Sequence, residues 1–143
     1  MRHLILLSIF AILFAVPSLS QDKADEVVLP DSVMKDVLRK IAASEVKPPK
    51  DERLIHVANQ GLGTDWLPEI KDVDFVLLDK DSQHRYAHDL YFWKDLRKQK
   101  DFYLIDFGYG DVYCSAHGST WVFRVVDGEA KDIRPDGGWG SAC

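Results

Sequence analysis

The sequence contains none of the short motifs that mark common catalytic and nucleotide-binding sites. No P-loop, no Gly-x-Ser-x-Gly nucleophile elbow and no calcium-binding loop occurs among its 143 residues. Gly61-Leu62-Gly63 lacks the third glycine of a dinucleotide-binding loop, so it indicates a turn. Asn-x-Ser/Thr, internal repeats and low-complexity tracts are absent as well. Function must therefore be sought in less specific patterns.

Long apolar runs are missing from all but the N-terminus. A short N-terminal segment, residues 1–3, carries the basic Arg2 and precedes thirteen uncharged residues, 4–16. Pro17 ends the run, and Ser18 and Ser20 follow with the small side chains that a signal peptidase requires. The alternative is an uncleaved anchor, but thirteen residues rise only about 20 Å as a helix, whereas the bilayer core is about 30 Å thick. We predict a signal peptide, residues 1–20, on a secreted or periplasmic protein with no stable membrane insertion after cleavage.

Cysteine is scarce, and both copies, Cys114 and Cys143, follow the predicted signal peptide. An even number of cysteines in an oxidising compartment favours one disulfide, which would join the C-terminal tail to a central strand. Two free thiols, or a link to another chain, are the alternatives.

Basic charge is also in deficit. The formal net charge is −5, and loss of Arg2 with the signal peptide would make it −6. Nucleic acid is thereby disfavoured as a partner, since its binding needs a basic surface. A protein, a peptide or a small molecule remains as the possible partner, and no cofactor is predicted.

Removing 20 of the 143 residues leaves 123, a length that normally forms one domain. We expect a flexible N-terminal lead at 21–30 and a single domain at 31–143. Apolar residues at helical spacing predict a helix over 32–45, capped by Asp31 or Ser32.

A second helix is predicted near 82–98, where Tyr86, Leu90 and Trp93 fall on one side of a helical wheel. The remaining patterns predict strands at 53–58, 72–79, 102–107, 112–116, 121–126 and 129–133. Asp127-Gly128 is a strong hairpin signal, and the glycine-rich tail from Pro135 is expected to be irregular.

This order of elements predicts an α+β domain with a curved, mostly antiparallel sheet of about five or six strands and helices on one face. The layout resembles a cystatin-like or cone-shaped α+β roll. The resemblance covers element order only, so it implies nothing about activity.

His84 and His88 have the i, i+4 spacing of a metal-binding pair on one helical face. Arg85 between them would repel a metal ion, and two solvated histidines are the alternative. Cys114 and His117 resemble half of a metal hook or a thiol nucleophile with its base, but their odd separation would place them on opposite faces of a strand.

Asp106 alternates with Phe102 and Leu104, which aims one carboxylate at an apolar surface. Burial would raise its pKa and suit a general acid or base, whereas contact with solvent at the strand end or an arginine partner would make it structural. Arg124 and Arg134 are the candidate partners.

Aromatic residues in loops supply the only candidate ligand surface. Trp66 and Trp139 are expected in loops, and Tyr109 flanks a glycine-rich turn. Such residues either cover the end of a core or form a recognition surface.

No nucleophile, base and orienting partner come together in the sequence. The leading prediction is a small secreted, non-catalytic binding or interaction domain of unknown ligand. The alternative is a secreted enzyme or metal-binding protein with a site centred on His84 and His88, and a purely structural extracellular component is the third possibility.

Overall fold

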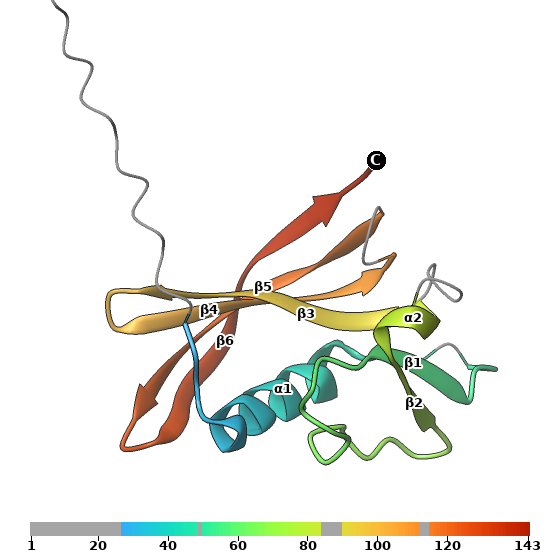
Figure 1. Cartoon of the computed structure of the whole chain (residues 1–143), viewed down its shortest axis with the longest axis horizontal. Helices are drawn as coiled ribbons and strands as arrows, with labels where there is room; N and C mark the ends of the chain where they lie inside the picture. Colours follow the sequence, from blue (N-terminus) through green and yellow to red (C-terminus); the bar gives the residue numbers. More distant parts are fainter. Residues whose placement is uncertain (1–26, 49, 84–89, 112–114) are drawn as a thin grey trace, which may run out of the picture.

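A computed structural model gives the fold, and it describes residues 27–48, 50–83, 90–111 and 115–143. Within these ranges, six strands form one open sheet, and a long helix, α1 (Asp31–Glu45), packs against one face of it (Figure 1). We call the face that α1 covers the inner face and the opposite one the outer face. The predicted α+β class and the number of strands are confirmed.

Helix α1 has nearly the predicted bounds. Its buried side chains recur three and four residues apart and form one stripe against the sheet: Val33, Met34, Val37, Leu38, Ile41 and Ala42. The predicted cap was wrong, because Pro30 occupies the N-cap position and no side chain caps the helix. The Pro30 carbonyl accepts hydrogen bonds from the backbone N–H groups of Val33 and Met34.

The strands follow the order β2-β1-β3-β4-β5-β6 across the sheet. Strand β1 (Leu54–Ala58) pairs in parallel with β2 (Asp74–Leu78) and with β3 (Leu90–Gln99). The pairs from β3 to β6 are antiparallel. The sheet is therefore mixed, and the predicted mostly antiparallel sheet describes only the β3–β6 half. The long loop at 59–73 makes the parallel β1–β2 pair feasible by returning the chain to the start of β2.

The predicted helix over 82–98 was wrong. Only α2 (Lys80–Gln83) is helical in the described part of this region; residues 84–89 lie outside the described residues, and residues from Leu90 onward form β3. Residues 90–93 are all apolar, so they fit a helical stripe and a strand buried on both faces equally well. In the structure Phe92 packs on the outer face, whereas Tyr91 and Trp93 pack against the inner core.

Strands β4 (Phe102–Gly110) and β5 (Ala116–Val126) extend further than predicted, because glycines expected to interrupt them lie inside the sheet. Gly108 is the cross-strand neighbour of both Phe92 on β3 and Gly118 on β5. Glycine in a strand leaves room for a close neighbour, and here it accommodates large aromatic rings. Most of the predicted strand at 112–116 lies outside the described residues.

The tail was wrongly predicted to be irregular, since β6 runs over Glu129–Ser141. Gly137, Gly138 and Gly140 carry no side chains from which an alternating pattern can be recognised, and Pro135 argues against a central strand. Strand β6 lies at the edge of the sheet, where proline is tolerated because one side of the strand needs no ladder hydrogen bonds.

Aspartates with positive φ shape the turns and bulges. Asp127 and Gly128 have φ values of 53° and 77°, as a two-residue hairpin turn of the predicted kind requires. Asp95 and Asp132, with φ of 53° and 56°, lie where the pairing register shifts in β3 and β6. Such bulges increase the local twist of the sheet and make the edge strand β6 less regular.

The inner core lies between α1 and strands β4 and β5, where Ile105, Phe107, Trp121 and Phe123 meet the helical stripe. The loop at 59–73 closes one end of this core. Its Trp66 is 2% exposed. Nearby, Lys35 Nζ lies 2.9 Å from Asp65 Oδ2 and ties the loop to α1.

Cys143 lies two residues beyond the end of β6, in the described part of the chain. Cys114 lies outside the described residues, so the pairing of these two cysteines stays a prediction. Ala116 and Ser141, each two residues from a cysteine in the sequence, are cross-strand neighbours.

Candidate functional site

The outer face of β3–β6 carries its side chains in cross-strand rows. Three successive rows are Phe92-Gly108-Gly118-Trp139, Lys94-Asp106-Thr120-Gly137 and Arg97-Leu104-Val122-Arg134. Lys94, Arg97 and Arg134 thus share one face with Arg124, in a chain whose net charge is negative. In Figure 1, helix α1 lies on the opposite side of the sheet from this face.

Asp106 lies at the centre of this face and is 7% exposed. Arg97 donates two hydrogen bonds to its carboxylate, at 2.9 and 3.0 Å, and the Thr120 hydroxyl donates a third at 2.7 Å. Burial raises the pKa of Asp106, but the hydrogen bonds from Arg97 and Thr120 outweigh it and the net pKa is lowered. The structural role is favoured over general acid–base chemistry, because the carboxylate is held ionised.

The predicted partners of Asp106, Arg124 and Arg134, were wrong. Strand β3 is the direct neighbour of β4, and the bulge between Lys94 and Arg97 places the Arg97 guanidinium beside the carboxylate. Arg124 is instead paired with Asp132, and Arg134 is the cross-strand neighbour of Val122.

Asp106→Asn is expected to lower the free energy of unfolding by about 2 kcal/mol at pH 7, because it breaks hydrogen bonds between charged groups and leaves Arg97 unpaired. A carboxyl with a lowered pKa in the fold stabilises it above its unfolded-state pKa, and this contribution is lost as the pH falls through the folded-state pKa. The difference between the two proteins should therefore shrink below about pH 4. Urea denaturation at several pH values measures it.

Asp36→Asn is the matched control, since it removes one carboxylate from an exposed i, i+4 pair with Lys40. A loss of less than about 0.5 kcal/mol is expected for it. Equal losses for the two variants at pH 7 would contradict the structural role of Asp106.

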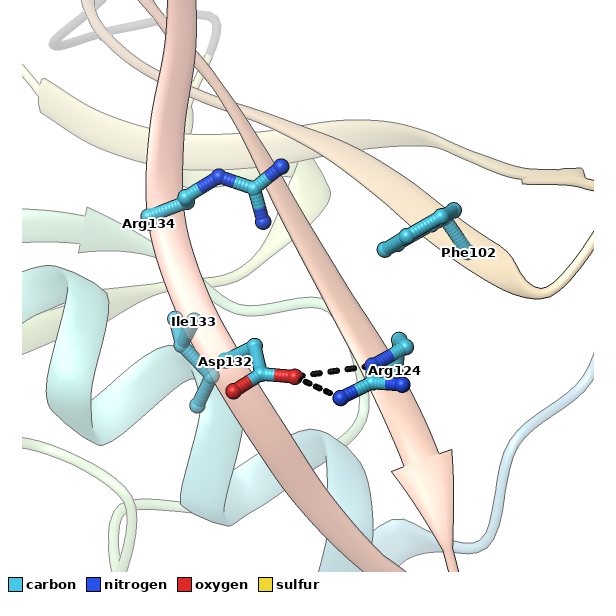
Figure 2. A pocket seen from close by; sticks show the side chains of 5 residues that line it. All are labelled: Phe102, Arg124, Asp132, Ile133 and Arg134. Atoms are coloured by element: carbon cyan, nitrogen blue, oxygen red, sulfur yellow. Dashed lines mark hydrogen bonds and ion pairs between the residues drawn. The ribbon is translucent and has the colours of Figure 1, made fainter.

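An open groove lies at the end of this face, lined by Phe102, Arg124, Asp132, Ile133 and Arg134, with a volume of about 420 Å³. We call it the arginine groove. Figure 2 shows Arg134 and Asp132 on β6, Arg124 on β5 and Phe102 on the neighbouring strand β4. The guanidinium carbon of Arg134 lies 6.0 Å from the Phe102 ring centroid. A cation and an apolar ring are thus presented together.

The two arginines of the groove differ in their partners. Arg124 Nε donates to Asp132 Oδ2 at 2.8 Å, and Arg124 Nη2 contacts the same oxygen (Figure 2). The Arg134 guanidinium makes no hydrogen bond or ion pair with any residue that the structure describes. Arg134 is therefore the donor group best placed to take an anion from solution.

Trp139 packs over the glycines of the first row. Its ring centroid lies 6.0 Å from that of Phe92, and Lys94 Nζ lies 4.2 Å from the Trp139 ring. The indole Nε1 is buried and has no hydrogen-bond partner among the described residues. Trp139 is therefore partly a cover for Phe92, and its use as a ligand surface stays a prediction.

A second pocket, of about 130 Å³, lies on the inner face beside the C-terminal end of α1. We call it the aromatic pocket; it is lined by Glu45, Tyr91, Phe107, Gly108, Tyr109, His117 and Gly118. The rings of Tyr91 and Tyr109 are 4.7 Å apart, and His117 lies edge-on to Tyr109 at 6.2 Å. The predicted ligand-surface residue Tyr109 thus belongs to a cavity wall.

Two hydrogen bonds lie at this pocket. Trp121 Nε1 donates to Glu45 Oε1 at 3.1 Å. Burial raises the pKa of the Tyr91 hydroxyl; a hydrogen bond from the Lys47 backbone N–H acts against this, and the charges of Glu45 and Glu52 add to the rise. Tyr91 therefore stays neutral at physiological pH, close to an acidic side chain.

The other predicted site residues are only partly placed. His84, His88 and Cys114 lie outside the described residues, and the described ranges contain no group of three or more potential metal ligands. The metal-site prediction is thus untested. Trp66 is buried in the inner core, which fits a cover over the core and leaves it unavailable as a ligand surface.

Sequence reasoning missed Arg97 and Glu45. Arg97 was assigned to a helix, which concealed its position opposite β4. Glu45 is the last residue of α1, and only the packing of the helix on β5 brings it to Trp121. An acidic residue at the C-terminal end of a helix is electrostatically unfavourable and was a usable signal.

No family model, curated protein or solved structure matches this chain. The fold and the two sites therefore carry the functional argument alone. Over the described ranges, no helix has the length and apolarity needed to cross a membrane.

Proposed function

We propose that this chain is a secreted, non-catalytic binding domain whose ligand carries an anionic group joined to an apolar group. The arginine groove is its binding site. The observation that carries the proposal is the Arg134 guanidinium, which lies over Phe102 and has no partner in the described part of the chain.

The physical basis is a preorganised donor beside an apolar surface. Guanidinium groups bind carboxylates and phosphates through paired N–H donors, and they stack on aromatic faces. Arg124 is held by Asp132, which adds a second positive group whose position is fixed. A ligand that bridges the two arginines would bury its apolar part against Phe102, which is 37% exposed.

Binding is favoured over catalysis because the charge of the buried carboxylate on this face is balanced by an arginine. Asp106 is ionised and accepts hydrogen bonds from Arg97 and Thr120, so it has no proton to donate. The alternative enzyme or metal protein with a site at His84 and His88 remains a prediction that this geometry does not favour.

Phenylacetate tests the proposal, with phenylacetamide as its uncharged counterpart. We expect phenylacetate to shift backbone NMR signals around Phe102 and Arg134, and Arg134→Gln to weaken its affinity about tenfold through loss of a charged hydrogen bond. Arg53→Gln removes the same charge before β1 and should leave the affinity unchanged. Equal binding of the amide, or wild-type affinity in Arg134→Gln, would contradict the proposal.

Secretion and the disulfide are parts of the same proposal. Intact mass spectrometry of protein exported from a secreting host, alkylated without reduction, tests both. A mass that matches a chain beginning at Gln21 and carrying no alkyl groups supports both secretion and the disulfide. An uncleaved chain overturns the signal peptide, and two alkylated thiols overturn the disulfide.

A further inference from the structure

The aromatic pocket combines aromatic walls with one acidic side chain. Glu45 and the rings of Tyr91, Phe107 and Tyr109 line it, and no lysine or arginine among the described residues does. From this combination we infer that the pocket binds an ammonium group, either methylated or primary, at the tip of a larger ligand. The inference concerns the inner face and is independent of the arginine groove.

The aromatic rings supply the first attraction. The Tyr91 ring centroid lies 6.0 Å from that of Phe107 and 4.7 Å from that of Tyr109, and the ring planes are inclined by 27° and 48°. Ammonium groups are attracted to the negative faces of such rings, most strongly when water is excluded. A tilted group of rings contacts a rounded cation from more than one direction.

Glu45 supplies the opposite charge. Its Oε1 accepts the hydrogen bond from Trp121 Nε1, so the carboxylate is fixed in orientation. Its Oε2 makes no hydrogen bond or ion pair with the described residues. One oxygen of an oriented carboxylate is thus left to face a bound cation.

Helix α1 adds to this field. Glu45 is its last residue, and the last turn contains no basic residue. The C-terminal end of a helix carries a partial negative charge from its unpaired carbonyl groups, which favours cations nearby. An acidic residue at this end is unfavourable for the isolated helix, and a bound cation would relieve the repulsion.

The volume limits the size of the bound group. A cavity of about 130 Å³ holds about four groups the size of water, at about 30 Å³ each. This room suits a trimethylammonium or a primary ammonium head group, with the rest of the ligand outside. Gly108 and Gly118 line the pocket with backbone atoms only.

Choline tests the inference, with 3,3-dimethylbutan-1-ol as its uncharged carbon counterpart. NMR titration of the full mature protein should give saturable choline shifts at Tyr109 and His117 and none with the alcohol. Glu45→Gln keeps the acceptor for Trp121 and removes the charge, so it should weaken choline binding about tenfold. Glu69→Gln, the same change in an exposed loop residue, should have no effect.

Thermal denaturation of each variant separates loss of binding from loss of the fold, and Tyr109→Phe, which keeps the ring, should retain binding. Equal binding of the alcohol, wild-type affinity in Glu45→Gln, or no choline shifts at 50 mM in a folded protein would overturn the inference. None of these results bears on the arginine groove, which phenylacetate tests.

Discussion

Gly118→Ala is expected to destabilise the domain by about 3 kcal/mol, and valine at this position should prevent folding. A Cβ on Gly118 would lie 2.0 Å from the Phe107 carbonyl oxygen and 2.6 Å from the Gly108 Cα. Both atoms belong to the backbone of β4, so relief requires the two central strands to move apart. Urea denaturation of the purified variants measures the loss.

Gly137→Ala is the matched control, since it makes the same change in the neighbouring strand β6. A Cβ at Gly137 meets nothing within 4 Å, and its φ is not in the left-handed region. We expect it to stabilise slightly, by about 0.5 kcal/mol, through the lower entropy of the unfolded chain. A similar stability for both variants would contradict the close approach of β4 and β5.

The change in stability caused by Gly108→Ala should fall between those caused by Gly118→Ala and Gly137→Ala. A Cβ on Gly108 would meet the end of the Trp139 ring at 2.4 Å and the His117 carbonyl oxygen at 3.0 Å. Trp139 lies on the edge strand, where a ring can move at lower cost than two paired backbones.

The elements predicted correctly are those with one apolar face. Helix α1 shows a clear period because one side packs and the other meets solvent. Segment 90–99 begins with four apolar residues and is buried on both faces there, so its period is concealed. In β6 the alternation is hidden because three glycines carry no side chains. Neither segment could be assigned without its strand neighbours.

The candidate sites depend on tertiary contacts that local patterns do not contain. Asp106 was recognised as a polar residue aimed at an apolar surface, but its partner Arg97 was assigned to a helix. The arginine groove joins Phe102 to Arg134, residues from β4 and β6 that meet only because β5 lies between them. Asp106 could be found in the sequence because it interrupts an apolar pattern, whereas its partners could not.

Phe92→Ala is expected to lower the free energy of unfolding by about 3–4 kcal/mol, because it removes a buried aromatic ring and leaves a cavity. Phe92 is 1% exposed and packs between Gly108 and the Trp139 ring. Loss of the ring should also expose Trp139, which would shift its fluorescence to longer wavelength. Urea denaturation followed by fluorescence measures both effects. In the predicted helix Phe92 would lie off the stripe that contains Leu90 and Trp93, so a large loss of stability also supports a strand at this position.

Phe102→Ala is the matched control on the next strand. Phe102 is 37% exposed and lines the arginine groove, so its loss should cost only about 1 kcal/mol. The two variants should then have opposite effects. Phe92→Ala lowers stability and leaves the phenylacetate affinity of the folded protein unchanged, whereas Phe102→Ala lowers that affinity. If Phe92→Ala proved as mild as Phe102→Ala, the outer face would not be packed as a second core, and Trp139 would be a recognition residue first.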